Sequence, residues 1–425
     1  MIALLLQVNF PVFARVYGGQ GDDWVYSMVS CPDGGFVLAG YTRGFGSRGA
    51  DVLVVKMGFT GEPEWATAAG GPGSEYANSV IRTIDGGFVV AGYTRSFGSG
   101  GADALIMKLG PDGELDWARV IGGAGNDCIN SLLQMPDGDL LLAGYTTSYG
   151  SGGSDMLLLR LNHKGEVVWA KTIGGPGSES ITSLVAAHDA GFLLLGYGPG
   201  PLLVCLDPSM EIIWARYLDM ASGYIQSGLA IPDGFLLSGW ARSKRGDPDA
   251  LVLRLNEKGR MIWAKRFGGS GYDWASSIVE LPDEGFGVAG CISFGHYNFL
   301  VLGLSDSGEL IWAKTFGSPG WDAASCILQT NDGGITLAGY TSGFGIGGDD
   351  ILVLRLGPHG WYPGCVVDCP LRIATLSAAQ RNASLEARPC SPTTSAPEIA
   401  FRRIAISALD VCPPPLEESD GSTDQ

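Results

Sequence analysis

The sequence predicts an all-β protein, a seven-bladed β-propeller closed by its N-terminal strand and followed by a small extension that contains Cys and Pro. Three observations predict this fold. One segment recurs at intervals of 45 to 52 residues, each copy carries hairpin turns between short apolar runs, and the first copy supplies only the last strand of a unit. Glycine makes up 66 of the 425 residues without a collagen period, which is typical of a chain with many tight turns.

Two motifs define the repeat. Trp-Ala-Lys-x-x-Gly-Gly and its looser copies start near residues 13, 65, 117, 169, 214, 263 and 312. Asp-Gly-Gly-Phe-x-x-Ala-Gly-Tyr-Thr or a variant of it follows each copy, with turns at Asp33, Asp85, Asp137, Asp189, Asp233, Asp283 and Asp332. Asp-Gly between apolar runs predicts a β-hairpin, because two-residue hairpin turns need positive φ and glycine adopts it at no steric cost.

Each unit is expected to form four short strands, which in the second unit fall at 77–83, 88–93, 104–109 and 114–121. Four-stranded units in tandem are typical of a β-propeller. An open β-solenoid is the alternative, although its coils are usually shorter and seldom carry two hairpins each.

The phase of the repeat predicts how the ring closes. The seventh unit has its first three strands within 323–356, and residues 13–17 match a fourth strand with no preceding three. We therefore expect the N-terminal strand to complete the seventh blade. Such pairing removes an open sheet edge that would invite aggregation.

The chain is expected to divide into a propeller at 1–360, a Cys-containing extension at 361–412 and a disordered tail at 413–425. Residues 371–378 and 399–411 could form strands, and 391–397 has the composition of a linker. Four cysteines within the extension suggest an oxidising compartment, with their pairing undetermined: Cys365, Cys369, Cys390 and Cys412.

The two repeat motifs are similar to those of the tandem β-propeller repeats in many secreted or surface-associated archaeal and bacterial proteins, most of which have no assigned activity. The resemblance implies an extracellular or cell-surface location. The segment Gly165-Glu-Val-Val-Trp169 also resembles a blade motif of quinoprotein propellers. Those enzymes commonly have eight blades and adjacent cysteines, so we do not expect a quinone cofactor here.

Charge and hydropathy exclude several partners. The net charge is −17, with 27 basic and 44 acidic side chains, which disfavours binding to nucleic acid. No run of 18 apolar residues occurs, so no transmembrane segment is predicted. We expect a monomer that binds a protein or glycan ligand.

Acidic residues recur just before the expected inner strand of six blades. They are candidate ligands for Ca²⁺, or for a cationic ligand, if they form a ring at the channel mouth. The alternative is that each carboxylate accepts hydrogen bonds from its own glycine-rich loop, and the six equivalent copies favour this architectural interpretation. The six residues are Asp23, Glu75, Asp127, Glu179, Asp273 and Asp322, with Gly223 at the seventh place.

Aromatic residues follow three of these acids and Gly223, and they vary from blade to blade. Trp24, Tyr76, Tyr224 and Trp274 are therefore candidates for stacking on a sugar. The uniform series that starts each Trp-Ala-Lys motif is instead expected to pack between blades. A serine ring on the inner strands, beginning with Ser27 and Ser79, is expected to hydrogen-bond between blades.

The sequence assigns no catalytic residue. Only four His occur, none lies at a repeated position, and no nucleophile motif is present. We therefore predict a non-catalytic extracellular propeller that acts as a binding scaffold through one loop rim. The alternative is an exported hydrolase or lyase that uses carboxylates at the channel mouth.

Overall fold

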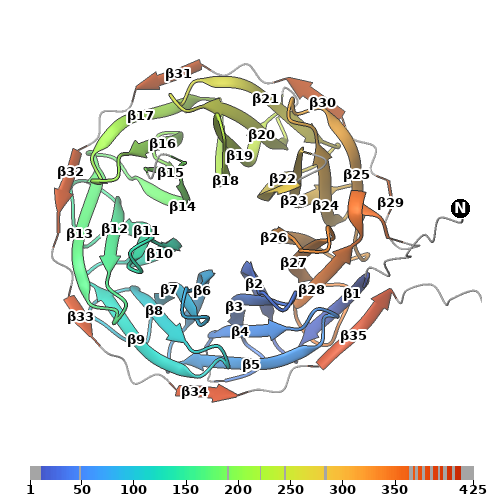
Figure 1. The fold of residues 1–425 in the computed structure, drawn as a ribbon, viewed down its shortest axis with the longest axis horizontal. Helices are drawn as coiled ribbons and strands as arrows, with labels where there is room; N and C mark the ends of the chain where they lie inside the picture. Colours follow the sequence, from blue (N-terminus) through green and yellow to red (C-terminus); the bar gives the residue numbers. More distant parts are fainter. Residues whose placement is uncertain are drawn as a thin grey trace, which may run out of the picture.

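The computed structural model describes residues 11–46, 49–188, 191–220, 222–243, 246–281 and 285–362, together with Cys390 and the short strands β29 to β35. Their strands form seven antiparallel sheets arranged around a central channel (Figure 1). The seven-bladed β-propeller predicted from the repeat is therefore confirmed. A short 3-10 helix, η1 (Pro358–Gly360), follows the last blade.

Each blade has its first strand at the channel and later strands progressively farther out (Figure 1). Blades 1 to 3 are β2 (Asp23–Ser30), β3 (Phe36–Thr42), β4 (Asp51–Met57) and β5 (Pro63–Gly70); β6 (Glu75–Arg82), β7 (Phe88–Thr94), β8 (Asp103–Leu109) and β9 (Leu115–Gly122); and β10 (Asp127–Gln134), β11 (Leu140–Thr146), β12 (Asp155–Leu161) and β13 (Val167–Gly174).

Blades 4 to 7 continue the same pattern. They are β14 (Ser180–Ala186), β15 (Phe192–Tyr197), β16 (Pro201–Leu206) and β17 (Ile212–Asp219); β18 (Gly223–Ile231), β19 (Gly234–Arg242), β20 (Pro248–Asn256) and β21 (Met261–Gly268); β22 (Trp274–Leu281), β23 (Gly285–Ser293), β24 (Tyr297–Leu304) and β25 (Leu310–Phe316); and β26 (Asp322–Gln329), β27 (Ile335–Thr341), β28 (Asp350–Leu356) and β1 (Phe13–Gly18).

The N-terminal strand closes the ring, as the phase of the repeat predicts. β1 pairs antiparallel with β28, and Phe13 lies opposite Arg355. Phe13 is buried and packs into the apolar cluster shared by blades 7 and 1. The Tyr17 hydroxyl donates a hydrogen bond of 2.7 Å to the carbonyl of Gly61 in blade 1. β1 therefore belongs to blade 7 by its backbone and contacts blade 1 through its side chains.

The Trp at the start of each Trp-Ala-Lys motif packs between blades, which confirms the prediction for this series. The ring of Trp65 in blade 1 lies beneath the turn of Gly113 in blade 2, where a Cβ would come within 2.7 Å of it. Gly113 has φ of 77°, a conformation that glycine adopts readily. Phe13 fills the same slot beneath Gly61.

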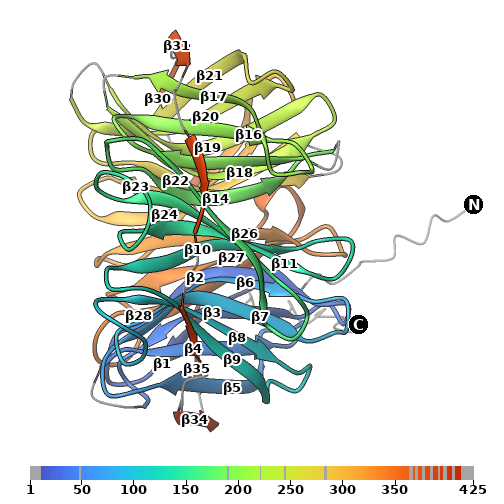
Figure 2. The same cartoon turned by 90° about the vertical axis from the view of Figure 1, so that its left-hand side faces the viewer.

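The C-terminal extension adds a fifth strand to the outer edge of every blade (Figure 1). These strands, called the outer belt, run around the ring in the reverse order of the blades (Figure 1). In the side view, β31 and β34 lie at opposite outer edges of the ring (Figure 2). The belt consists of β29 (Val367–Asp368) on β25, β30 (Arg372–Thr375) on β21, β31 (Ala379–Asn382) on β17, β32 (Glu386–Pro389) on β13, β33 (Thr393–Ser395) on β9, β34 (Ala400–Arg403) on β5 and β35 (Ser407–Cys412) on β1.

The belt has a sequence period that composition alone does not indicate. Strands β30 to β35 begin seven residues apart, at 372, 379, 386, 393, 400 and 407. The expected strand regions 371–378 and 399–411 contain β30 and β34, and the second also covers all but the last residue of β35. The expected linker 391–397 is corrected, because it contains β33. Residues 413–425 lie outside the described residues.

The described cysteines of the blade strands are buried. Cys205 and Cys291 are buried and in the reduced state, as expected. Cys390 of the extension is a free thiol and packs beside the apolar cluster of blades 2 and 3, so it takes no part in a disulfide of the extension. Cys365 and Cys369 lie outside the described residues.

The first prediction tests ring closure. Phe13→Ala should lower the free energy of unfolding by about 3 to 5 kcal/mol, the usual cost of emptying a buried Phe site. Equilibrium unfolding in urea measures the change, and Ile84→Ala, at a side chain that is 75% exposed, is the control. Equal stability of the two variants would contradict the closure.

Candidate functional site

Every inner strand carries a β-bulge at the same position. The register between β2 and β3 passes from Val25 directly to Ser27, so Tyr26 is left without a partner. Bulges leave one residue unpaired and redirect its side chain, often beside functional sites. The seven unpaired residues, called the bulge ring, are Tyr26, Asn78, Asn130, Thr182, Gln226, Ser276 and Ser325.

The glycine of the Ala-Gly-Tyr motif makes room for the bulge. A Cβ on Gly40 would lie 1.8 Å from the carbonyl oxygen of Trp24 on the facing strand. The equivalent clash occurs at 1.9 Å for Gly92 and 2.0 Å for Gly339. The motif that identifies the repeat therefore also marks where a side chain is turned into the channel.

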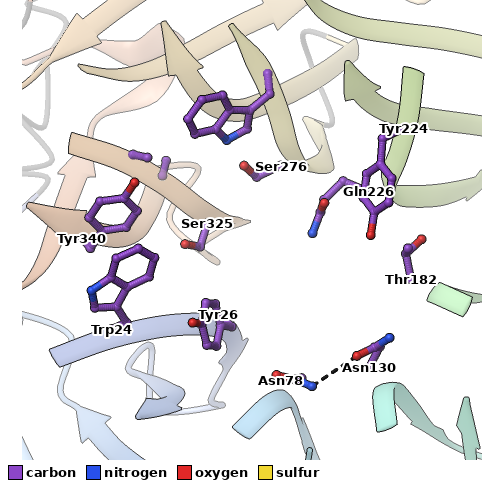
Figure 3. A pocket seen from close by; sticks show the side chains of 13 residues that line it. Trp24, Tyr26, Asn78, Asn130, Thr182, Tyr224, Gln226, Ser276, Ser325 and Tyr340 are labelled. Carbon is purple, nitrogen blue, oxygen red and sulfur yellow. Dashed lines mark hydrogen bonds between the residues drawn. The ribbon is translucent and has the colours of Figure 1, made fainter. Parts of the chain in front are cut away.

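The bulge ring surrounds one central cavity of about 380 Å³ (Figure 3). Trp24, Tyr224, Trp274 and Tyr340 form aromatic parts of its wall. Trp24 stacks on Tyr340 with ring centroids 3.8 Å apart and planes inclined by 11°. The cavity therefore combines flat aromatic faces with one side chain from each bulge.

Hydrogen bonding divides the bulge ring into two arcs. Asn78 donates to the carbonyl of Ile129 at 2.9 Å, and Thr182 donates to the carbonyl of Ile225 at 2.9 Å. Asn130 makes the same type of bond from blade 3 to blade 4, at 2.7 Å. The bulge side chains of blades 2 to 4 therefore bond neighbouring blades to each other.

The arc of blades 5 to 7 is different. Within the described part of the chain, the side chains of Gln226, Ser276 and Ser325 have no hydrogen-bond partner, although all three line the cavity. Figure 3 shows Tyr224 beside Gln226, and Ser325 near Trp24 and Tyr340. Trp274 lines the same cavity. Unused donors and acceptors thus share the cavity with aromatic faces.

The structure brings together three of the four aromatic residues singled out from the sequence. Trp24, Tyr224 and Trp274 line the central cavity. Tyr76 is not part of that lining and instead stacks on Tyr93, with ring centroids 4.9 Å apart. Tyr340 was missed because it belongs to the uniform Ala-Gly-Tyr motif.

The six acidic residues that precede the inner strands are buried and bonded within their own loops. In blade 1 the amide of Gly19 donates to Asp23 at 2.7 Å, and in blade 3 the amide of Gly123 donates to Asp127 at 2.8 Å. Glu75, Glu179, Asp273 and Asp322 accept the equivalent bond from the residue four positions earlier. Among the described residues, no three His, Cys, Asp or Glu side chains are grouped to hold a metal ion.

A second acid lies beside the first at most blade junctions. A Cβ on Gly122 would lie 2.1 Å from Oδ1 of Asp103 in blade 2 and 2.8 Å from Oδ2 of Asp127 in blade 3. The first glycine of each Gly-Gly thus leaves space for two carboxyl groups. The five junction pairs are Asp350 with Asp23, Asp51 with Glu75, Asp103 with Asp127, Asp155 with Glu179, and Asp249 with Asp273.

The junction between blades 4 and 5 shows why the two acids of a junction occur together with the first glycine of Gly-Gly. Gly200 and Gly223 stand where the two acids would be, and Asp219 replaces the first glycine. A side chain fits at Asp219 because both carboxyl groups are missing. Between blades 6 and 7, Asn298 replaces the first acid and Gly317 is retained.

Burial and mutual repulsion raise the pKa of several paired acids. Burial, with the charge of Asp127, raises the pKa of Asp103 to about 6. Burial, with Asp23 and Asp349 nearby, raises the pKa of Asp350 to about 7. The pKa of Asp273 is likewise raised to about 6, mainly by burial. These junctions therefore retain protons at pH values where an exposed Asp has lost its own.

Comparisons with known proteins find only distant structural similarity. No family model and no curated protein matches the chain. It is similar to BBS1N in complex with ARL6DN, with 11% identity, coverage of 81% of this chain and 97% of that chain, and a TM-score of 0.48. It is also similar to the periplasmic gluconolactonase PpgL of Pseudomonas aeruginosa, with 11% identity, 85% and 99% coverage and a TM-score of 0.43.

A protein of unknown function from Bacteroides caccae is similar as well, with 14% identity, 71% and 93% coverage and a TM-score of 0.39. Similarity at this level says nothing about activity or ligand. Within the described residues, no helix has the length and apolar character needed to cross a membrane.

The second prediction concerns pH. Because the folded-state pKa values of Asp103, Asp273 and Asp350 lie above the ordinary 3.8, the folded protein holds protons that the unfolded chain has released. Their stabilising contribution is complete below pH about 4 and is lost as the pH rises to about 7. The melting temperature should therefore fall between pH 5 and 7.5, as differential scanning calorimetry would measure.

Asp103→Asn provides the matched test, because Asn298 already stands at the equivalent position in blade 6. Compared with the wild type, the variant should be more stable at pH 7.5 than it is at pH 5. Its melting temperature should therefore fall less between pH 5 and 7.5. Asp306→Asn, at an exposed loop, is the control. A fall of the same size in wild type and Asp103→Asn would show that this pair does not titrate as described.

Proposed function

We propose that this protein is a non-catalytic binding scaffold that holds a carbohydrate in the central cavity at the channel mouth. The observation that supports this function is the arc of blades 5 to 7. Tyr224 and Trp274 line the cavity together with Gln226, Ser276 and Ser325, whose polar groups are unused within the described residues. A sugar ring has apolar faces and an equatorial rim of hydroxyl groups, so aromatic faces and convergent polar groups suit it.

The cavity favours binding over catalysis by channel-mouth carboxylates. Its described lining contains Trp, Tyr, Asn, Gln, Ser, Thr and Ala side chains and no Asp, Glu, His or Cys. General acid or base catalysis needs a titratable group within hydrogen-bond reach of the reacting atoms. The acids nearest the channel mouth, such as Asp127 and Asp273, are instead buried and bonded to loop amides.

An extracellular or cell-surface location is part of this proposal. It is supported by the resemblance of the repeats to those of secreted and surface-associated proteins. A glycan ligand accords with that location. The free thiol of Cys390 gives the proposal no support.

The third prediction tests the cavity directly. The wild-type protein should bind oligosaccharides on a glycan array, and the best ligand should then be titrated by isothermal calorimetry. Trp274→Ala should weaken its affinity by about tenfold or more, and Gln226→Ala should weaken it less, because burying an aromatic face outweighs one solvent-exposed hydrogen bond.

Trp361→Ala is the control, because Trp361 is 56% exposed and does not line the cavity. Its affinity should match that of the wild type. Failure of the folded wild-type protein to bind any glycan, or unchanged affinity in Trp274→Ala, would overturn the proposed function.

A further inference from the structure

A second cavity of about 550 Å³ adjoins the central one between blades 5 and 6. Tyr224, Gln226 and Trp274 line both cavities, so a ligand that contacts these residues can extend from one into the other. The remaining lining residues of this outer pocket are Trp240, Arg242, Pro248, Tyr272 and Asp273.

Aromatic side chains form much of the outer pocket. Trp240 lies opposite Tyr224 in the pairing of β18 with β19. Tyr272 comes from blade 6 and is 56% exposed, which is high for a large aromatic side chain. The pocket thus offers aromatic faces from both blades, as the central cavity does, and it is wide enough for a further sugar unit.

Arg242 distinguishes the outer pocket from the central cavity. The repeat places Arg43 at the equivalent position of blade 1, where its guanidinium donates to Asp22 at 2.9 Å. Both arginines make the same backbone bond, from Arg43 to the carbonyl of Asp22 and from Arg242 to the carbonyl of Ser222. Because Ser222 replaces the acid, no described residue accepts a hydrogen bond from the Arg242 guanidinium.

The acid in the outer pocket, Asp273, forms no ion pair with Arg242. Asp273 is buried, and its two carboxylate oxygens accept hydrogen bonds from the amides of Gly269 and Ser293 at 2.7 and 2.8 Å. The exposed Arg242 is thus the free cation among the lining residues. A guanidinium binds a carboxylate in a planar, two-bonded geometry that neutral donors cannot reproduce.

We propose that the outer pocket binds a uronic acid unit, with its carboxylate on Arg242, while neighbouring neutral sugars occupy the central cavity. This inference rests on the proposed carbohydrate function and names the class of ligand. The net charge of −17 opposes the approach of a polyanion, whereas the pocket offers one cation. The ligand is therefore a largely neutral oligosaccharide that carries a single acidic sugar.

The test uses three oligosaccharides of equal length: a xylo-oligosaccharide with one glucuronic acid branch, its methyl ester, and the unbranched neutral chain. Calorimetric titration at pH 7.5 and low salt should give at least about tenfold tighter binding for the free acid than for the ester, because hydrogen bonds to charged groups exceed neutral ones. Arg242→Ala should remove this preference, so that the free acid and the ester bind with equal affinity.

Arg95→Ala is the matched control, because Arg95 occupies the equivalent position in blade 2 and does not line the outer pocket. It should retain the preference for the acid. Arg242→Gln is a second variant that keeps the length of the side chain, and it should behave as Arg242→Ala does.

The possible results distinguish the acidic subsite from the proposed carbohydrate binding. Equal binding of acid and ester by the wild type, or an unchanged preference in both Arg242 variants, overturns the acidic subsite while carbohydrate binding stands. Absence of binding for all three chains, together with a negative glycan array, overturns the proposed function itself.

Discussion

Pairing of β1 with β28 is the constraint on which the rest of the structure depends, because it converts a row of blades into a closed ring. The candidate site exists only in that ring: each of its seven bulge residues comes from a different blade. No short segment of the chain could assemble the cavity alone. The link is also a packing contact, since Phe13 and Tyr17 are buried against blade 1.

The repeated positions hold the blades together, and the variable positions distinguish the site. Gly-Gly supplies an amide for one carboxylate and space for a second, and where both acids are missing Asp219 takes the glycine position. The residue at the bulge position does not bond to the same partners in every blade. Its identity can therefore differ from blade to blade. Blades 2 to 4 use it for inter-blade bonds, whereas blades 5 to 7 leave it unused within the described residues.

The sequence was sufficient to predict the blade number, the strand that closes the ring, the packing of Trp65 and its equivalents, and three aromatic residues of the cavity. It did not reveal the bulge ring, because simple alternation along a strand does not show where an extra residue is inserted. The repeated serine next to the bulge position was the residue that the sequence indicated. Ser27 does accept an inter-blade hydrogen bond from the amide of Val80. The outer belt was missed because its strands of two to six residues form on blade edges far away in the sequence.

The most direct test of the account is a crystal structure of the protein soaked with the oligosaccharide that binds most tightly. We expect a sugar ring against Trp274 or Tyr224 in the central cavity, with a hydroxyl group bonded to Gln226, Ser276 or Ser325. A ligand bound only on the outer belt or on the opposite face of the ring, with the central cavity free of sugar, would contradict it.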